Sequence, residues 1–135
     1  MRTFSRFLIL ILSSVYFSSC AVKLVQQKPS IYIDITPIEA QRKIEQNKKV
    51  LLLDVRTKEE FSEWHLKNAV NIPVQELEER LDELKKYKDF EIIVYCKGGV
   101  RSKIAGEILV KNGFKYVYNL SGGINEWKKQ FEAKQ

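Results

Sequence analysis

The stretch "YCKGGVRSK", residues 95–103, brings together residue types that could carry out nucleophilic chemistry. Cys96 follows an apolar run, Gly98 and Gly99 come just after it, and Arg101 opens a segment with a helical pattern. The thiolate form of cysteine is a nucleophile, and glycines let the backbone curl so that its N–H groups point inward. A helix N-terminus and the charge of Arg101 add positive potential. The pattern predicts an anion cradle around Cys96, with a lowered thiol pKa.

A buried structural cysteine beside a flexible loop is the simpler interpretation of the same residues. The functional interpretation is favoured, because strand, cysteine, glycines, arginine and helix occur in the order that the chemistry requires. Two reactions suit an anion cradle around a thiolate. One is hydrolysis of phosphate esters through a phosphocysteine, and the other is sulfur transfer through a persulfide.

Alternating strands and helices must position this loop, and apolar patterns predict them along the domain. The expected strands are 31–35, 50–55, 69–73, 91–95 and 116–120, and the expected helices follow Thr36 and Thr57, cover 75–87 and 101–112, and run on from Ile124. The connections are too long for hairpins, so we expect an α/β fold with a mainly parallel five-stranded sheet and helices on both faces. Cys96 would then lie at the carboxyl end of a central strand, where such sheets bind ligands.

Capping residues and apolar spacing support these helices. Thr36 with Glu39, and Thr57 with Glu60, have the pattern of a capping box. The apolar residues expected on one face of each later helix are Leu77, Leu81 and Leu84; then Ile104, Ala105, Ile108 and Leu109; then Ile124, Trp127 and Phe131.

The composition limits the possible partners. The chain has 135 residues, of which 44% are apolar and 30% charged, with a formal net charge of +6. This suits one domain with its own core. Lysines are scattered among glutamates without interleaved aromatic residues, which is typical of a solvated surface. We therefore expect a monomeric domain that binds no nucleic acid.

The N-terminus has the layout of a secretory signal peptide. Arg2 and Arg6 precede an apolar run over 7–12, which is too short for a membrane span, and Ser18-Ser19 precede Cys20. The sequence "FSSC" resembles a bacterial lipobox, in which the cysteine is lipidated. We expect a signal peptide over 1–19, lipidated Cys20 with a tether over 20–30, and the domain over 31–135. The protein would be exported and lipid-anchored to a bacterial membrane, with its domain facing the periplasm or cell exterior. Plain secretion and a short membrane anchor are the alternatives.

This assignment leaves Cys96 as the single cysteine of the domain. No disulfide can form within the domain, and one cysteine with the single histidine, His65, makes no zinc site. An unpaired thiol in an oxidising compartment suggests a function.

Four ordered segments resemble the rhodanese-like domains: "LLDVR" (52–56), "EEFSEWHLKNAVNIP" (59–73), "IVYCKGGVRS" (93–102) and "NLSGGINEW" (119–127). The resemblance implies a compact α/β domain whose loop cysteine accepts sulfane sulfur, with no metal or organic cofactor. By position, Cys96 is the persulfide carrier. The implied cradle consists of Lys97, Gly98, Gly99, Val100 and Arg101, and the implied supporting residues are Asp54, Arg56 and Ser102.

Loop length separates the two reactions within this resemblance. Four residues lie between Cys96 and Arg101, as in the sulfurtransferase type, whereas the phosphatases that share the fold carry one more. We therefore expect transfer of sulfane sulfur from thiosulfate or a similar small anion to a thiol or cyanide. A non-enzymatic sulfur carrier or partner-binding module, and a small phosphatase or arsenate reductase, remain as alternatives.

One departure concerns 64–66, where Trp-His-Leu stands in place of the usual Gly-His-Ile. It must alter the local turn or its packing. We interpret His65 as a structural residue that hydrogen-bonds the backbone near this turn, because a general base would have to reach the reacting thiol.

Overall fold

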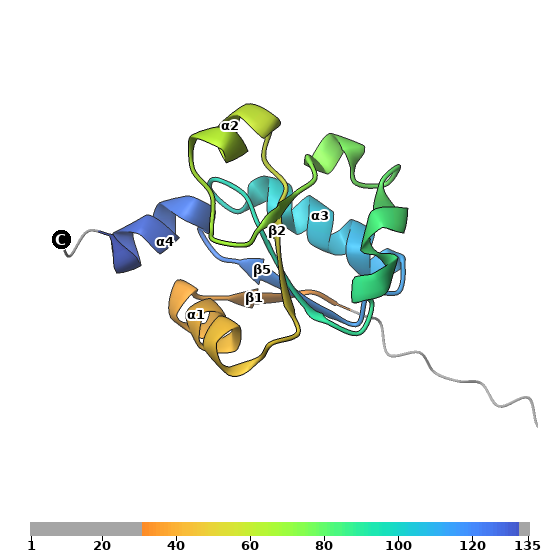
Figure 1. The fold of residues 1–135 in the computed structure, drawn as a ribbon, viewed down its shortest axis with the longest axis horizontal. Helices are drawn as coiled ribbons and strands as arrows, with labels where there is room; N and C mark the ends of the chain where they lie inside the picture. Colours follow the sequence, from red (N-terminus) through yellow and green to blue (C-terminus); the bar gives the residue numbers. More distant parts are fainter. Residues whose placement is uncertain (1–30, 133–135) are drawn as a thin grey trace, which may run out of the picture.

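The sheet that the apolar runs predict is present, and all five of its strands are parallel (Figure 1). The computed structural model describes residues 31–132. The strands are β1 (Ile33–Ile35), β2 (Val50–Asp54), β3 (Val70–Asn71), β4 (Glu91–Tyr95) and β5 (Tyr116–Leu120), in the spatial order β1-β5-β4-β2-β3. The two edge strands are shorter than the sequence predicts, which leaves little unpaired edge.

In the described part of the chain, four α-helices and two 3₁₀ segments lie between the strands or, in the case of the last helix, after them. They are α1 (Pro37–Gln46), α2 (Lys58–Glu63), η1 (Val74–Glu76), η2 (Leu81–Tyr87), α3 (Val100–Lys111) and α4 (Gly123–Phe131). Both predicted capping boxes are formed, with Thr36 and Thr57 each accepting a hydrogen bond from the backbone N–H three residues later.

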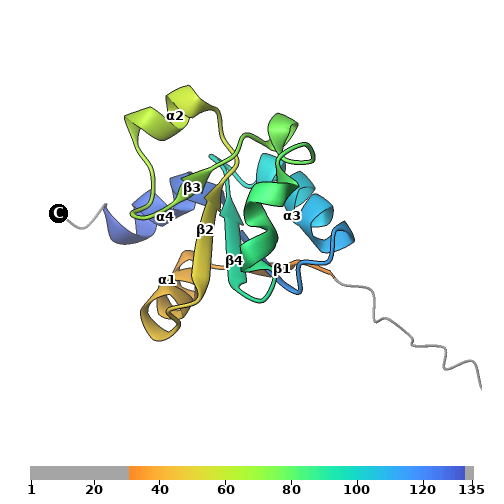
Figure 2. The ribbon, with the colours of Figure 1, turned by 45° about the vertical axis from the view of Figure 1, so that its right-hand side comes forward.

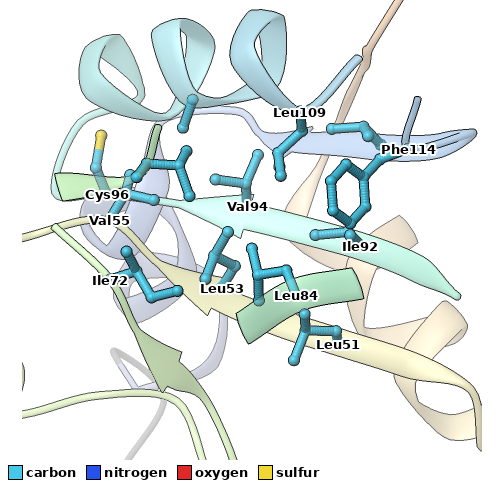
Figure 3. Close-up of a cluster of buried hydrophobic side chains, with 13 residues drawn as sticks. Leu51, Leu53, Val55, Ile72, Leu84, Ile92, Val94, Cys96, Leu109 and Phe114 are labelled. Carbon is cyan, nitrogen blue, oxygen red and sulfur yellow. The ribbon is translucent and has the colours of Figure 1, made fainter. Parts of the chain in front are cut away.

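Helices cover both faces of the sheet, as expected (Figure 2). Successive residues of a strand point to opposite faces, so one apolar run supplies two cores. Leu51 and Leu53 pack with α3 and the 3₁₀ segments, and Leu52 packs with α1 and α4. Figure 3 shows the first core, in which Cys96 and Phe114 lie at opposite ends.

The prediction of one α-helix over 75–87 is wrong. The chain forms η1 and η2 instead, with bonds from Leu77 N–H to the Val74 carbonyl and from Lys88 N–H to the Lys85 carbonyl. In a 3₁₀ helix side chains three apart lie on one line. The apolar residues follow this spacing in two sets, Val74 with Leu77, and Leu81 with Leu84 and Tyr87. Leu77 and Leu81, which are four residues apart, lie on either side of the turn between the two segments.

The apolar faces predicted for α3 and α4 are present, except at one exposed residue in each. Ile104 is 50% exposed, while Gly106 is buried because the Tyr32 ring packs so closely that a Cβ there would lie 2.9 Å from it. In α4, Ile124 is buried, but Phe131 is 37% exposed and packs on Trp127 with the two rings tilted at 52° to each other.

The predicted signal peptide, lipidated Cys20 and tether fall in residues 1–30, outside the described residues. Within 31–132, no helix has the length and apolar character needed to cross a membrane.

Candidate active site

Cys96 directly follows β4, at the edge of the sheet where the parallel strands end. Its neighbours β2 and β5 pair with β4 up to Tyr95 and Val94 respectively, and a further bond joins Val55 N–H to the Tyr95 carbonyl. The Cys96 residue is only 1% exposed and closes one end of the first core (Figure 3). A reacting group must therefore enter the loop between Cys96 and α3.

Hydrogen bonds within this loop converge on the sulfur. Gly99 N–H donates to Cys96 Sγ at 3.0 Å, and Ser102 Oγ lies 3.5 Å from the same sulfur. Burial opposes ionisation, but hydrogen bonds from the Ser102 hydroxyl and from the N–H groups of Ser102, Gly99 and Gly98 outweigh it, so the pKa of Cys96 is lowered. The direction agrees with the sequence prediction.

The N-terminus of α4 holds the loop from behind. Ile124 N–H donates to the Cys96 carbonyl at 2.9 Å, and Asn125 N–H donates to the Lys97 carbonyl at 3.1 Å. In a trans peptide the C=O and the following N–H point in opposite directions, so these bonds turn the N–H groups of Lys97 and Gly98 away from α4. Gly98 is one of the groups that lower the Cys96 pKa.

Gly123 makes this approach possible. It has φ +57°, and an added Cβ would lie 2.3 Å from the Cys96 oxygen and 2.7 Å from the Lys97 oxygen. Gly122 and Gly123 form the start of α4, and the contact of Gly123 with the cysteine loop was not predicted, because nothing in the local sequence indicates which backbone approaches the glycine.

The two loop glycines have different roles. Gly99 has φ +101° and is the N-cap of α3, whereas a Cβ on Gly98 would meet nothing within 4 Å. Val100, which is 74% exposed, and Lys97, also exposed, lie at the rim of the loop.

Arg101 forms a two-pronged ion pair with Glu60 of α2. Its two terminal nitrogens donate to the two carboxylate oxygens at 2.7 and 2.9 Å. This pairing is the main reason that the pKa of Glu60 falls to about 2 and that of Arg101 is raised, and the negative charge of Cys96 contributes to the latter. The full charge expected from Arg101 is thus shared with a carboxylate. Sequence reasoning recognised Glu60 only as a capping residue.

Asp54 and Arg56 form a second ion pair, which is buried. Arg56 donates to Asp54 from Nε and from a terminal nitrogen, with a shortest distance of 2.6 Å, and to the Trp64 carbonyl at 2.6 Å. The Asn71 side chain donates to the backbone carbonyls of both residues at 3.0 Å. The pair therefore fixes the chain on either side of α2, and hence Glu60. The contribution of Asn71 was not predicted.

Trp64 fits without a special turn. Its φ of −167° is extended backbone, which any residue adopts, and the Lys128 ammonium lies 4.2 Å from its ring centroid. His65 stacks on Phe61, and its Nδ1 lies 2.8 Å from the Phe61 carbonyl oxygen. The interpretation of His65 as a residue that hydrogen-bonds nearby backbone is confirmed.

The chain matches a known protein family and resembles solved structures. Residues 36–130 match the family described as "Rhodanese-like domain". The fold superposes on the rhodanese-related protein of Thermoplasma volcanium with a TM-score of 0.66 and 30% identity, over 74% of this chain and 94% of that one.

Two curated relatives carry named activities. The chain is 33% identical over 98 residues to the thiosulfate sulfurtransferase GlpE of Coxiella burnetii, covering 73% of this chain and 89% of the relative. It is 42% identical over 83 residues to the tRNA uridine(34) hydroxylase of Buchnera aphidicola subsp. Baizongia pistaciae, covering 58% of this chain. That match spans only 27% of the hydroxylase.

Proposed function

The chain belongs to the rhodanese-like domain family, and from this premise we propose that it is a sulfurtransferase that carries sulfane sulfur as a persulfide on Cys96. The donor is thiosulfate or a similar sulfur compound, and the acceptor is a thiol or cyanide. The observation that carries the proposal is the bond from Gly99 N–H to Cys96 Sγ, in a loop whose carbonyls are held by α4. Similarity to a thiosulfate sulfurtransferase over 89% of its length supports it.

The reaction divides into two displacements at sulfur. The Cys96 thiolate attacks the outer sulfur of thiosulfate, a new S–S bond forms as the donor's S–S bond breaks, and sulfite leaves. An acceptor thiolate or cyanide then attacks the outer sulfur of the persulfide and releases the Cys96 thiolate. Loop N–H groups stabilise the negative sulfur in both steps without having to reorganise.

Intact-mass measurement of the protein after incubation with thiosulfate tests this proposal. We expect one added sulfur, about 32 Da, with release of sulfite, as covalent catalysis requires. Cyanide should remove the added mass and yield thiocyanate. The Cys96→Ala variant is the control for the site. An unmodified mass with thiosulfate and with persulfide donors, while Cys96 is reduced, would contradict the proposal.

A phosphatase is the rival enzyme, and the four residues between Cys96 and Arg101 argue against it. Hydrolysis of a phosphate ester that is lost in a Cys96→Ser variant would favour it instead. Persulfide formation without turnover to small acceptors would favour a sulfur carrier that delivers to a partner protein.

We further propose that the chain is exported and anchored by lipid at Cys20. Arg2, Arg6, the apolar run and Ser18-Ser19 before Cys20 support this location. Two or more acyl chains are enough for stable anchoring. Full-length and Cys20→Ala forms should separate into membrane and soluble fractions respectively. Firm membrane binding of an uncleaved Cys20→Ala form would identify an ordinary anchor instead.

A further inference from the structure

Both arginines of the proposed site are already paired with carboxylates. Arg56 binds Asp54 at 2.6 to 3.1 Å, and Arg101 binds Glu60 at 2.7 and 2.9 Å. Each pair has no net charge. The cysteine loop therefore acts on a ligand mainly through backbone N–H groups and the Ser102 hydroxyl, and not through a free guanidinium.

The fold holds Glu60 in this position. Its carboxylate also accepts the Thr57 N–H at 3.1 Å, which closes the capping box of α2. Arg56 fixes the far end of that helix through the Trp64 carbonyl. Glu60 and Arg101 are both half-buried, with side chains 27% and 30% exposed, so water screens the pair only in part. A ligand that recruited Arg101 would have to break two hydrogen bonds and leave the Glu60 charge beside itself.

This arrangement distinguishes sulfur donors by their charge. Thiosulfate carries two negative charges, whereas a hydropersulfide R–S–SH carries at most one on its sulfurs. Because Glu60 neutralises Arg101, a ligand near Arg101 meets no free positive charge, and this loss affects the dianion more than the monoanion or the neutral form.

We propose that Glu60 determines donor specificity, by holding Arg101 away from the ligand and so selecting thiol persulfides over thiosulfate. The inference rests on the proposed sulfur transfer through Cys96 and names its donor class. In this step the Cys96 thiolate attacks the terminal sulfur of R–S–SH. A new S–S bond forms between Cys96 Sγ and the terminal sulfur, and the S–S bond of the donor breaks. The thiolate R–S⁻ leaves, and the proton stays on the transferred sulfur. No oxidant or reductant is consumed.

The test compares two donors on three proteins. Persulfide formation on Cys96 is measured as kcat/KM with thiosulfate and with cysteine hydropersulfide, for the unmodified chain, Glu60→Gln and Glu59→Gln. Glutamine at position 60 can still complete the capping box, so α2 keeps its N-terminal cap. Glu59→Gln removes the same charge from the same helix turn but leaves the Arg101 pair intact.

We expect the unmodified chain to prefer cysteine hydropersulfide by about tenfold or more. Glu60→Gln should raise kcat/KM for thiosulfate by about tenfold, mainly through a lower KM, because Arg101 becomes free to bind the anion. It should change the value for the persulfide less than threefold, and Glu59→Gln should leave the donor ratio unchanged. The double variant Glu60→Gln/Arg101→Ala should lose the gain, which assigns the effect to Arg101.

Failure of this inference and failure of the proposed function are distinguishable. If neither donor adds sulfur to Cys96, the proposed function is wrong. If both add sulfur but the unmodified chain prefers the persulfide less than threefold, or Glu60→Gln leaves the donor ratio unchanged, the specificity role is wrong and sulfur transfer stands. If Glu60→Gln does not fold, the donor preference of the unmodified chain alone tests the inference, and a preference for the persulfide below threefold contradicts it.

Discussion

Ser102 has a single hydroxyl proton and two acceptors within reach of it. The hydroxyl donates to the Gly99 carbonyl at 3.1 Å and lies 3.5 Å from Cys96 Sγ, completely buried. A hydroxyl rotates to suit its surroundings, so it can donate to the sulfur once Cys96 has lost its proton. Ser102 therefore favours the thiolate, which is the reacting form.

Replacing Ser102 by alanine should raise the pKa of Cys96 and so move the pH profile of persulfide formation upward. Titrating the thiolate by ultraviolet absorbance, with Cys20 changed to serine, measures the shift. Because the pKa of Cys96 is lowered in the folded state, the ionised thiol stabilises the fold above the ordinary thiol pKa, and this stabilisation is lost as the pH falls through the lowered folded pKa. Ser102→Ala should therefore also reduce the stabilisation that the ionised thiol provides. Ser62→Ala, an exposed serine on α2, is the control. Equal midpoints in the Ser102→Ala and unmodified proteins would show that the hydroxyl does not act on the sulfur.

Substituting Gly123 by alanine should displace the cysteine loop. The new Cβ would need the space of the Cys96 and Lys97 carbonyl oxygens, which cannot yield without turning their peptide groups. A misplacement of about 1 Å in a reacting group can cost about 100-fold in rate, and we expect a loss of that order in persulfide formation. Lys129→Ala, on an exposed position of α4, should stay within twofold. A Gly123→Ala protein with full activity would mean that α4 does not set the loop geometry.

The cysteine was identifiable from sequence because its chemistry, glycines and helix start are all local. Glu60 and Gly123 were not assigned to the site, because their roles depend on contacts across 41 and 27 residues of chain respectively. The capping box at Thr57 also accounts for a glutamate at position 60, so the sequence gives no reason to expect Arg101 as a second partner.

At the level of elements, the buried strands were the most predictable part. The bounds of β4 and β5 match the predicted runs, because a strand covered on both faces is continuously apolar and ends sharply. The sequence pattern predicts one α-helix in place of the two 3₁₀ segments, since the spacings of four and three between Leu77, Leu81 and Leu84 suit an α-helical face. The spacing of three becomes visible only when Val74 and Tyr87 are included, and their packing against the first core is not local information.

Inserting one glycine between Gly99 and Val100 tests the element that joins β4 to α3. Gly99 both donates to the sulfur and caps α3, so an extra residue must separate the thiol from the helix start. We expect persulfide formation to fall by about tenfold or more, because the N–H groups no longer converge. Intact mass after thiosulfate treatment gives the yield, and a phosphate-ester assay detects any activity gained by the wider loop. Unchanged sulfur transfer would show that loop size does not select the reaction.

Within residues 31–132 the sheet separates two cores, and the Cys96 side chain lies at one end of the first. Phe114 lies at the opposite end of that core from Cys96 and is 1% exposed (Figure 3). Stability and chemistry should therefore be separable by mutation.

Phe114→Ala should lower the free energy of unfolding by about 3 to 5 kcal/mol, through lost burial and the cavity left behind. Urea denaturation measures the loss, and persulfide yield at low temperature should be unchanged in the fraction that remains folded. Phe131→Ala removes a ring that is 37% exposed and should cost far less. Equal losses for the two variants would contradict the assignment of Phe114 to the core.

The pairing of β1 with β5 has a consequence for the order of events during synthesis. The side-chain amide of Asn119 in β5 donates a hydrogen bond to the carboxylate of Asp34 in β1, which lies 85 residues earlier in the chain. At about 5 to 20 residues per second, a ribosome needs about 4 to 17 s to make the intervening chain. Because β1 pairs only with β5 among the described strands, it cannot join the sheet until Leu120 has emerged. Any factor that binds the nascent N-terminus has those seconds in which to act before folding closes the sheet.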